Sequence, residues 1–146
     1  MFFTSAQLHR YLSCIAFTGP VVELEPVTAT LSSISSTYGE LAGANCIDGN
    51  TAPVSTMPLG GICHTENGEA KPWIAIDYGT RVIVERVEIF NRGDCCGDRT
   101  RNVDVRISDE LPTSGDQMFS GGTLLGHFAG PGTNGQHIIV SGQKLL

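Results

Sequence analysis

The sequence has little charge and no long apolar run, and each shortage removes a class of protein. Only 16% of its 146 residues are charged, against a usual share of about 25%. A coiled coil would be rich in Glu and Lys, and a transmembrane segment needs roughly 20 consecutive apolar residues, so we expect neither. A hydrophobic content of 40% is enough to bury a core and argues against disorder. A single globular domain remains, because domains typically have about 100–150 residues.

Excess positive charge and catalytic motifs are also absent. The net charge is −6, whereas a nucleic-acid surface needs a basic face, so we expect no nucleic acid among the partners. The chain has no G-x-S-x-G, H-E-x-x-H or Walker sequence. Residues 130–135 match G-x-G-x-x-G, but they precede a strand-like run and not the helix that a nucleotide site requires. We therefore predict that the protein is not an enzyme.

What the sequence does contain is glycine, at 18 positions, with short runs rich in Val and Ile between the turns. Within one run, apolar residues alternate with Asp104 and Arg106, which is the period of a strand buried on one face. Several such runs separated by Gly and Pro predict an all-β fold, a jelly-roll β-sandwich. The predicted strands are Val27–Leu31, Trp73–Tyr78, Val82–Val84, Arg86–Asn91, Val103–Ile107, Leu124–Phe128 and His137–Val140.

The first twenty residues do not share this pattern. Apolar residues at helical spacing allow an amphipathic helix over Ala6–Phe17. The short apolar stretch after Arg10 is also compatible with a weak secretory signal. We expect residues 1–20 to be a leader or a disordered extension and residues 21–146 to form the domain.

Two loops combine residue types that suit binding. Residues 45–50, Asn-Cys-Ile-Asp-Gly-Asn, offer several of the oxygen ligands that calcium prefers, although an ordinary Asx turn explains the same residues. Residues 91–99 place two arginines seven positions apart, with an aspartate and adjacent cysteines between them. Guanidinium groups suit hydroxyls or carboxylates, and the aspartate can fix one of them by a charge-assisted hydrogen bond. The competing interpretation is a solvated charged hairpin with two free thiols.

Several segments together resemble the F-type lectins (fucolectins) of the discoidin-like, galactose-binding superfamily: NCIDGN, CHT, PW and RVEIFNRGDCCGDR, followed by NVDVRIS. The resemblance runs from about residue 32 to residue 107, and NRGDCCGDR is its most specific part. It implies a jelly roll that binds L-fucose at one end and holds a structural calcium ion (Ca2+) nearby. The carbohydrate-binding residues that it implies are His64, Arg92, Asp94, Cys95, Cys96 and Arg99, with Cys95 and Cys96 joined as a disulfide against the sugar. The metal ligands that it implies are Asn45, Asp48 and Asn50, with a backbone carbonyl from Ile62.

Three features depart from the family pattern. His64 directly follows Cys63, where the family has one residue between, so either His64 or Thr65 faces the sugar. Pro58 and Leu59 stand where the family has an aromatic wall, which would change or widen selectivity. The chain ends before the closing C-terminal strand of the family, so we expect that strand to be missing and the domain to be incomplete.

The cysteine count supports an oxidising environment. If Cys95 and Cys96 pair as the resemblance implies, three of the five cysteines remain. Cys46 and Cys63 both flank the expected calcium region, so we expect a second bridge between them, with Cys14 left over. Disulfides indicate an extracellular, secreted protein.

The sequence therefore predicts a calcium-containing lectin module that recognises L-fucose. Its expected partners are fucosylated glycans or glycoproteins, and a homo-oligomer is compatible with the sequence. The alternative is a discoidin-like adhesion module that binds protein or lipid headgroups through the same loops, without fucose specificity. The motivation for this alternative is the loss of the aromatic wall and a cluster of six arginines between residues 81 and 106.

Overall fold

The computed structural model describes residues 2–3, 6–9, 31–48, 51, 62–79, 84–109 and 120–144, and its elements are mainly strands. In chain order they are β1 (Phe2–Phe3), β2 (Ala6–His9), β3 (Leu31–Ile34), the 3-10 helix η1 (Gly43–Cys46), β4 (Cys63–His64), β5 (Ile74–Asp77), β6 (Val84–Phe90), the 3-10 helix η2 (Gly97–Arg99), β7 (Val103–Ile107), β8 (Thr123–Phe128) and β9 (His137–Lys144). All strand pairs among these residues are antiparallel. In the described part of the chain, no helix is long and apolar enough to cross a membrane.

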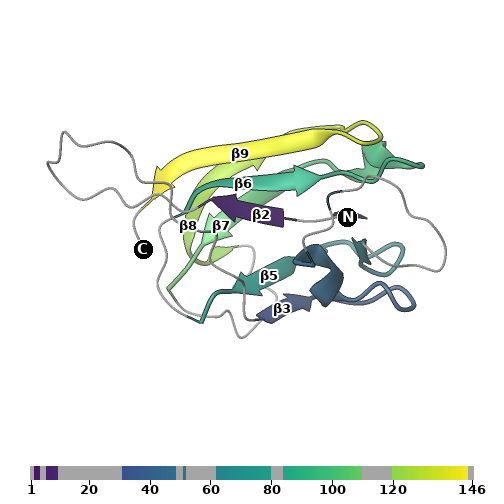
Figure 1. Ribbon diagram of the computed structural model, residues 1–146, viewed down its shortest axis with the longest axis horizontal. Helices are drawn as coiled ribbons and strands as arrows, with labels where there is room; N and C mark the ends of the chain where they lie inside the picture. The colour runs from purple at the N-terminus through teal and green to yellow at the C-terminus, as the bar shows by residue number, and fades with distance from the viewer. Residues whose placement is uncertain are drawn as a thin grey trace, which may run out of the picture.

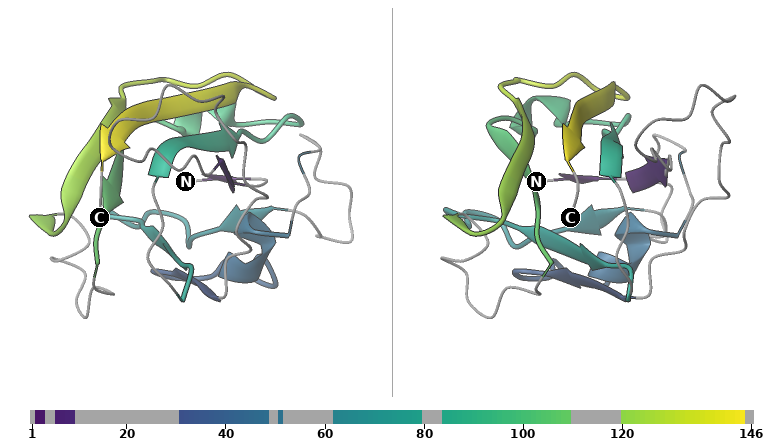
Figure 2. Two further views of the ribbon diagram at one scale, coloured as in Figure 1. Left: turned by 60° about the vertical axis from the view of Figure 1, so that its left-hand side comes forward. Right: turned by 90° about the vertical axis from the view of Figure 1, so that its left-hand side faces the viewer.

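The strands form two layers (Figure 1). In one layer β6 is hydrogen-bonded between β2 and β9, and the β7–β8 pair packs beside β9. The β3–β5 pair forms the opposite layer, together with η1, as the rotated views in Figure 2 show. The small β1–β4 pair brings β4 against η1. The predicted all-β sandwich is confirmed.

Alternation along β6 and β9 places the core between the layers. Ile89 on β6 lies opposite Ile138 on β9, and both are buried. Val140 on β9 is also buried, whereas Ile139 between them is 55% exposed. Burying one such aliphatic side chain contributes about 1.5–3 kcal/mol. Cys46 and Cys63 belong to the same buried cluster, so the core reaches directly under the loops that follow β4 and β6.

Most predicted strands form close to their predicted bounds. Val103–Ile107 is β7 as predicted, with Val103 and Ile107 buried, Asp104 exposed and a β-bulge between Val105 and Arg106. The predicted strand His137–Val140 continues as β9 to Lys144 because it pairs along the whole length of β6. Residues 27–30 and 82–83 of the predicted strands lie outside the described residues.

The N-terminal segment differs from the helix considered for it. Ala6–His9 is strand β2, and its four residues pair in register with Ile89, Val87 and their neighbours on β6. A free sheet edge offers a row of backbone donors and acceptors, and this overrides the weak helical spacing of so short a segment. That residues 1–20 serve as a leader stays a prediction, since most of them lie outside the described residues.

Candidate functional site

Two loops carry the side chains that the sequence analysis selected for sugar binding. The arginine loop, residues 91–100, follows β6, and the histidine loop, residues 64–72, begins in β4. A third segment, the 129–136 connection between β8 and β9, lies against the arginine loop. Its backbone forms three hydrogen bonds with that loop. The Asn91 N–H donates to the Gln136 carbonyl, the Gly132 N–H to the Thr100 carbonyl and the Gly135 N–H to the Arg92 carbonyl.

Asn91 is the polar centre of the arginine loop. The side chain is fully buried, at 0% exposure, and a buried amide must satisfy both its donors and its acceptor. Its Nδ2 donates to the carbonyls of Gly97 and Thr133, each at 2.9 Å. Its Oδ1 accepts from the N–H of Arg92 at 3.0 Å and from the Thr100 hydroxyl at 2.9 Å. One side chain therefore fixes both ends of the loop and joins it to the 129–136 connection.

Arg92 is held by the carboxylate two residues away. Its Nε and Nη2 donate to the two carboxylate oxygens of Asp94, each at 2.5 Å. The hydrogen bonds from Arg92 hold the pKa of Asp94 below its usual range and raise the pKa of the guanidinium. The Arg92 guanidinium is therefore held in one orientation by Asp94.

The second arginine is placed by a disulfide and a tight turn. Cys95 and Cys96 are bonded to each other, as the resemblance implied, with Cα atoms 3.8 Å apart. Cys96 has φ of 60°, in the left-handed region, and directly precedes the short helix η2, which ends at Arg99. Gly97 is buried against the 129–136 connection so closely that a Cβ there would lie 2.6 Å from the Thr133 carbonyl oxygen. This position therefore requires glycine.

His64 is buried at the start of the histidine loop. It is 6% exposed, and its backbone is held between the N–H of Tyr38 and the carbonyl of Leu41. The His64 Nδ1 is hydrogen-bonded to the Thr65 carbonyl. Burial lowers the pKa of His64, against the effect of that carbonyl, and the positive charges of Arg92 and Arg99 lower it further. The imidazole therefore lies within the electrostatic field of both arginines.

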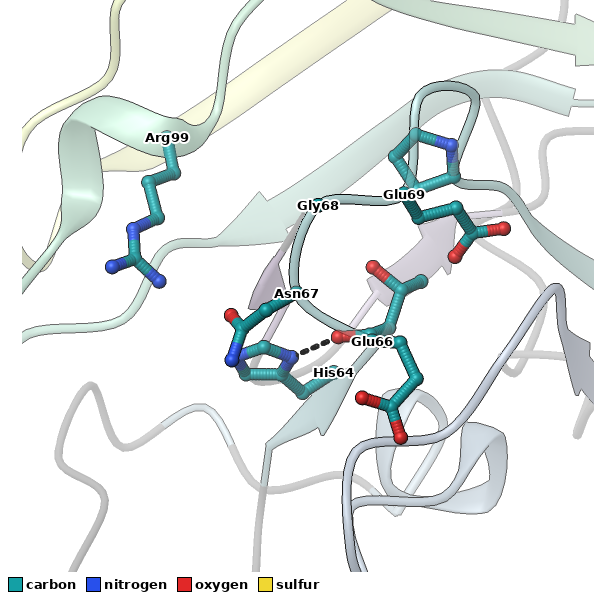
Figure 3. Close-up of a pocket in the computed structure, with 8 residues that line it drawn as sticks. His64, Glu66, Asn67, Gly68, Glu69 and Arg99 are labelled. Carbon is teal, nitrogen blue, oxygen red and sulfur yellow. Dashed lines mark hydrogen bonds between the residues drawn. The ribbon is translucent and has the colours of Figure 1, made fainter.

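The histidine loop and Arg99 enclose a pocket of about 300 Å³. Figure 3 shows Arg99 reaching in from η2 on one side, and residues 64–69 curving around the other. The lining residues are His64, Thr65, Glu66, Asn67, Gly68, Glu69, Pro72 and Arg99. Of the predicted sugar contacts, His64 and Arg99 line this pocket, whereas Arg92, Asp94, Cys95 and Cys96 are not among its lining residues.

The choice between His64 and Thr65 as the sugar-facing residue stays a prediction. Both line the pocket and both are buried, at 6% and 2% exposure. Pro58 and Leu59, where the family has its aromatic wall, lie outside the described residues.

Sequence reasoning missed a segment that precedes the site by almost thirty residues. Tyr38 is 43% exposed, and the centroid of its ring lies 4.9 Å from that of His64. Ser36 contacts the histidine loop at both Glu66 and Glu69. These residues follow β3 and no local motif marks them, so only the fold could bring them to the histidine loop. Tyr38 supplies an aromatic surface near His64 from a different part of the chain.

The residues expected to hold calcium are partly assembled. The Asn45 Nδ2 donates to the Ile62 carbonyl at 2.9 Å, so these two expected ligands meet. Asp48 is exposed just after η1, and Asn50 lies outside the described residues. No group of three or more His, Cys, Asp or Glu in the described chain could hold a metal. The expected ligands are instead amide and carbonyl oxygens with one carboxylate, a donor set that fits Ca2+.

The second expected disulfide also forms. Cys46 at the end of η1 is bonded to Cys63 in β4, with Cα atoms 5.3 Å apart and a sequence separation of 17. Both residues are buried, at 1% and 0% exposure. The bridge therefore fixes the start of the histidine loop to the core. Cys14 lies outside the described residues.

The sandwich and its loop-borne site define a discoidin-like, galactose-binding type of domain. A family model described as the NedA-like, galactose-binding domain matches residues 45–127, more than half of the chain. The chain is 35% identical over 72 residues to fucolectin of Anguilla anguilla and 38% identical over 82 residues to pentraxin fusion protein of Xenopus laevis. A crystal structure of an F-lectin (fucolectin) from striped bass serum, Morone saxatilis, matches with a TM-score of 0.67 and 26% identity over 82% of this chain. The chain belongs to the NedA-like, galactose-binding family and, within it, is similar to the F-type lectins.

The matched relatives are longer than this chain. It covers 44% of the Anguilla anguilla fucolectin, 19% of the pentraxin fusion protein and 39% of the striped bass chain. The matches to the two curated relatives cover 49% and 56% of this chain. The chain therefore spans less than half the length of each of these relatives.

Proposed function

We propose that this domain is a lectin module that binds L-fucose and fucosylated glycans between the arginine loop and the histidine loop. The observation that supports this most strongly is the Arg92–Asp94 fork beside Arg99 and His64. Asp94 fixes the Arg92 guanidinium through two bonds of 2.5 Å, and the charges of Arg92 and Arg99 both act on His64. Three nitrogen-bearing groups are thus held near one another by the fold itself.

The chemistry of these groups suits a deoxyhexose. Guanidinium N–H groups are fixed donors that fit sugar hydroxyls, and a neutral imidazole can donate or accept. Burial and the two arginine charges favour the neutral form of His64, because they lower its pKa. The Cys95–Cys96 disulfide and the Tyr38 ring offer apolar surface for the ring edge and methyl group of the sugar.

The relatives supply independent support for a carbohydrate ligand. Those from Anguilla anguilla and striped bass serum are named as fucolectins, and the latter shares the fold over most of this chain. The serum source of that protein and the two disulfides here support an extracellular location. Fucosylated glycoproteins are the partners that we propose.

Calcium is part of the proposal as a structural ion. Asn45, Asp48 and the Ile62 carbonyl would hold it, together with Asn50. The meeting of Asn45 and Ile62 at 2.9 Å supports this, because rotating the Asn45 amide would present its oxygen beside the carbonyl oxygen. When bound, calcium supplies charge that fixes oxygen-bearing loops in one conformation. Here that would hold the segment after η1 against the start of the histidine loop.

Titration with L-fucose tests the proposal, followed by NMR or calorimetry. Arg92→Ala and Arg99→Ala should each reduce affinity at least tenfold, since hydrogen bonds to charged groups contribute about 1.5–3 kcal/mol. Arg101→Ala is the matched control, because it removes the same charge two residues from Arg99, where Arg101 instead pairs with Asp98. Its affinity should equal that of the wild type.

Two results would contradict fucose binding. One is the absence of any fucose-dependent change in the folded wild-type protein. The other is equal affinity in the wild type, Arg92→Ala and Arg99→Ala. Binding to liposomes or to a protein partner without any glycan signal would favour the adhesion module instead.

A further inference from the structure

The wall of the pocket opposite Arg99 is acidic. Glu66 and Glu69 both line the pocket from the histidine loop, and Figure 3 shows them on the side away from Arg99. The fucose proposal gives neither residue a role. Because they line the same pocket as His64 and Arg99, a glycan that extends beyond a fucose held there would lie beside them.

The acidic wall is held in place by the segment after β3. The Ser36 hydroxyl donates to Oε2 of Glu69 at 2.5 Å and accepts from the N–H of Glu66 at 2.9 Å. These contacts cross 33 and 30 residues of sequence. Two neighbouring contacts strengthen the same attachment: the Tyr38 N–H donates to the His64 carbonyl, and the Ser35 N–H donates to the Trp73 carbonyl. The histidine loop is thus attached to the sandwich at its beginning, middle and end.

The charges at the pocket do not cancel. Its lining holds two carboxylates, Glu66 and Glu69, against one guanidinium, Arg99. Arg92 does not line the pocket, and its charge is already paired with that of Asp94. The carboxylates of the lining therefore outnumber its guanidinium groups by two to one.

We propose that Glu66 and Glu69 make this site selective for neutral glycans and disfavour fucosylated glycans that carry a carboxylate or sulfate on the neighbouring sugar. The inference rests on the proposed fucose binding and adds the class of glycan. Carboxylates accept hydrogen bonds from the hydroxyl and amide N–H groups of a neutral sugar. They repel an anionic sugar at the same place, and this repulsion between like charges lowers the affinity for the anionic glycan.

The test uses one glycan in two charge states. A fucosylated oligosaccharide ending in sialic acid is compared with its methyl ester, which has almost the same size and no charge. The wild-type protein should bind the ester more tightly. Each carboxylate should account for a factor of about 1.5 to 5, as for exposed charge pairs. The preference should shrink in high salt, where the screening length falls to about 3 Å at 1 M.

The variants Glu66→Gln and Glu69→Gln keep size and hydrogen-bonding capacity while removing charge. The double variant should bring the ester-to-acid affinity ratio close to one. Glu85→Gln is the matched control, because it removes one carboxylate at the start of β6, the end of that strand away from the arginine loop. It should leave the ratio at the wild-type value.

The outcomes separate this inference from the fucose proposal. If the wild type binds neither fucose nor the ester, both fail. If it binds fucose but binds acid and ester equally, or prefers the acid, only the charge selectivity fails. It also fails if the double variant keeps the wild-type ratio while remaining folded by circular dichroism.

Discussion

The replacement Asn91→Ala should damage this protein more than any substitution of a charged residue at the site. It removes four hydrogen bonds made by one side chain at 0% exposure: those to Gly97, Thr133, Thr100 and the N–H of Arg92. Alanine is smaller, so nothing replaces the lost donors and acceptor. The groups left behind are two carbonyls, one hydroxyl and one N–H, in a place with little access to water.

The expected cost follows from these contacts. A buried hydrogen bond between neutral groups contributes about 0.5–1.5 kcal/mol net, and a partner left unsatisfied costs about 1–3 kcal/mol. Four hydrogen bonds at the net value of about 0.5–1.5 kcal/mol each give about 2–6 kcal/mol. We expect a loss of about 4 kcal/mol, because some of the carbonyls left without a partner will be hydrated. A typical domain has only about 5–15 kcal/mol of stability. The variant should therefore fold marginally.

Urea denaturation measures this directly, with fluorescence of the single tryptophan, Trp73, as the signal. Thr100→Val is the graded comparison, because it removes one of the four bonds and keeps the shape; it should cost about 1–2 kcal/mol. Gln136→Ala removes an exposed hydrogen bond to the N–H of Thr133 and should cost less than about 1 kcal/mol. A loss below about 1 kcal/mol in Asn91→Ala would refute the view that this side chain holds the arginine loop together.

Three further predictions concern the histidine, the buried disulfide and calcium. Burial lowers the pKa of His64 below its ordinary 6.5, so the unfolded chain binds a proton more readily than the folded chain. The free energy of unfolding should therefore fall as the pH drops below 6.5. In urea titrations, His64→Gln should make this free energy less dependent on pH. The double variant Cys46→Ala with Cys63→Ala should lose about 3 kcal/mol of unfolding free energy, from the entropy of a loop with separation 17, and a loss below about 1 kcal/mol would argue against the bridge. Calcium should raise the melting temperature of the wild type but not that of Asp48→Asn. The control is Asp109→Asn, which removes an exposed carboxylate after β7 and should keep the calcium-dependent rise. Equal shifts in all three proteins would contradict the proposed ligand set.

The strands were predictable because their signal is local. In Val103–Ile107 the alternation of apolar and polar residues is visible within five residues, and the structure uses it to separate core from solvent, with Val103 and Ile107 buried and Asp104 exposed. The N-terminal segment shows the limit of this reasoning. Ala6–His9 becomes a strand because an edge of β6 is available to it, and no pattern within the segment encodes that edge.

Part of the candidate site could be read from the sequence. The spacing of Arg92, Asp94 and Arg99 within one loop correctly indicated an arginine held by an aspartate, because those contacts are short in sequence. The Cys95–Cys96 disulfide came from the family resemblance, and the Cys46–Cys63 bridge from the position of both cysteines beside the expected calcium region. Tyr38 and Ser36 could not be found in this way. Their contacts with the histidine loop cross some thirty residues and depend on how the two layers pack.

Asn91 explains why such a site depends on residues that never touch a ligand. A hydroxyl-rich sugar offers many weak contacts, so a selective site must hold its donors in place before the sugar arrives. Arg92 is already fixed by Asp94, and the backbone beneath both is fixed by Asn91 and by the Gly97 contact with Thr133. The conformational entropy lost in ordering these groups during folding is not lost again when the sugar binds. The same reasoning applies to Ser36 and the acidic wall, where a fixed carboxylate can discriminate between charged and neutral glycans better than one free to turn away.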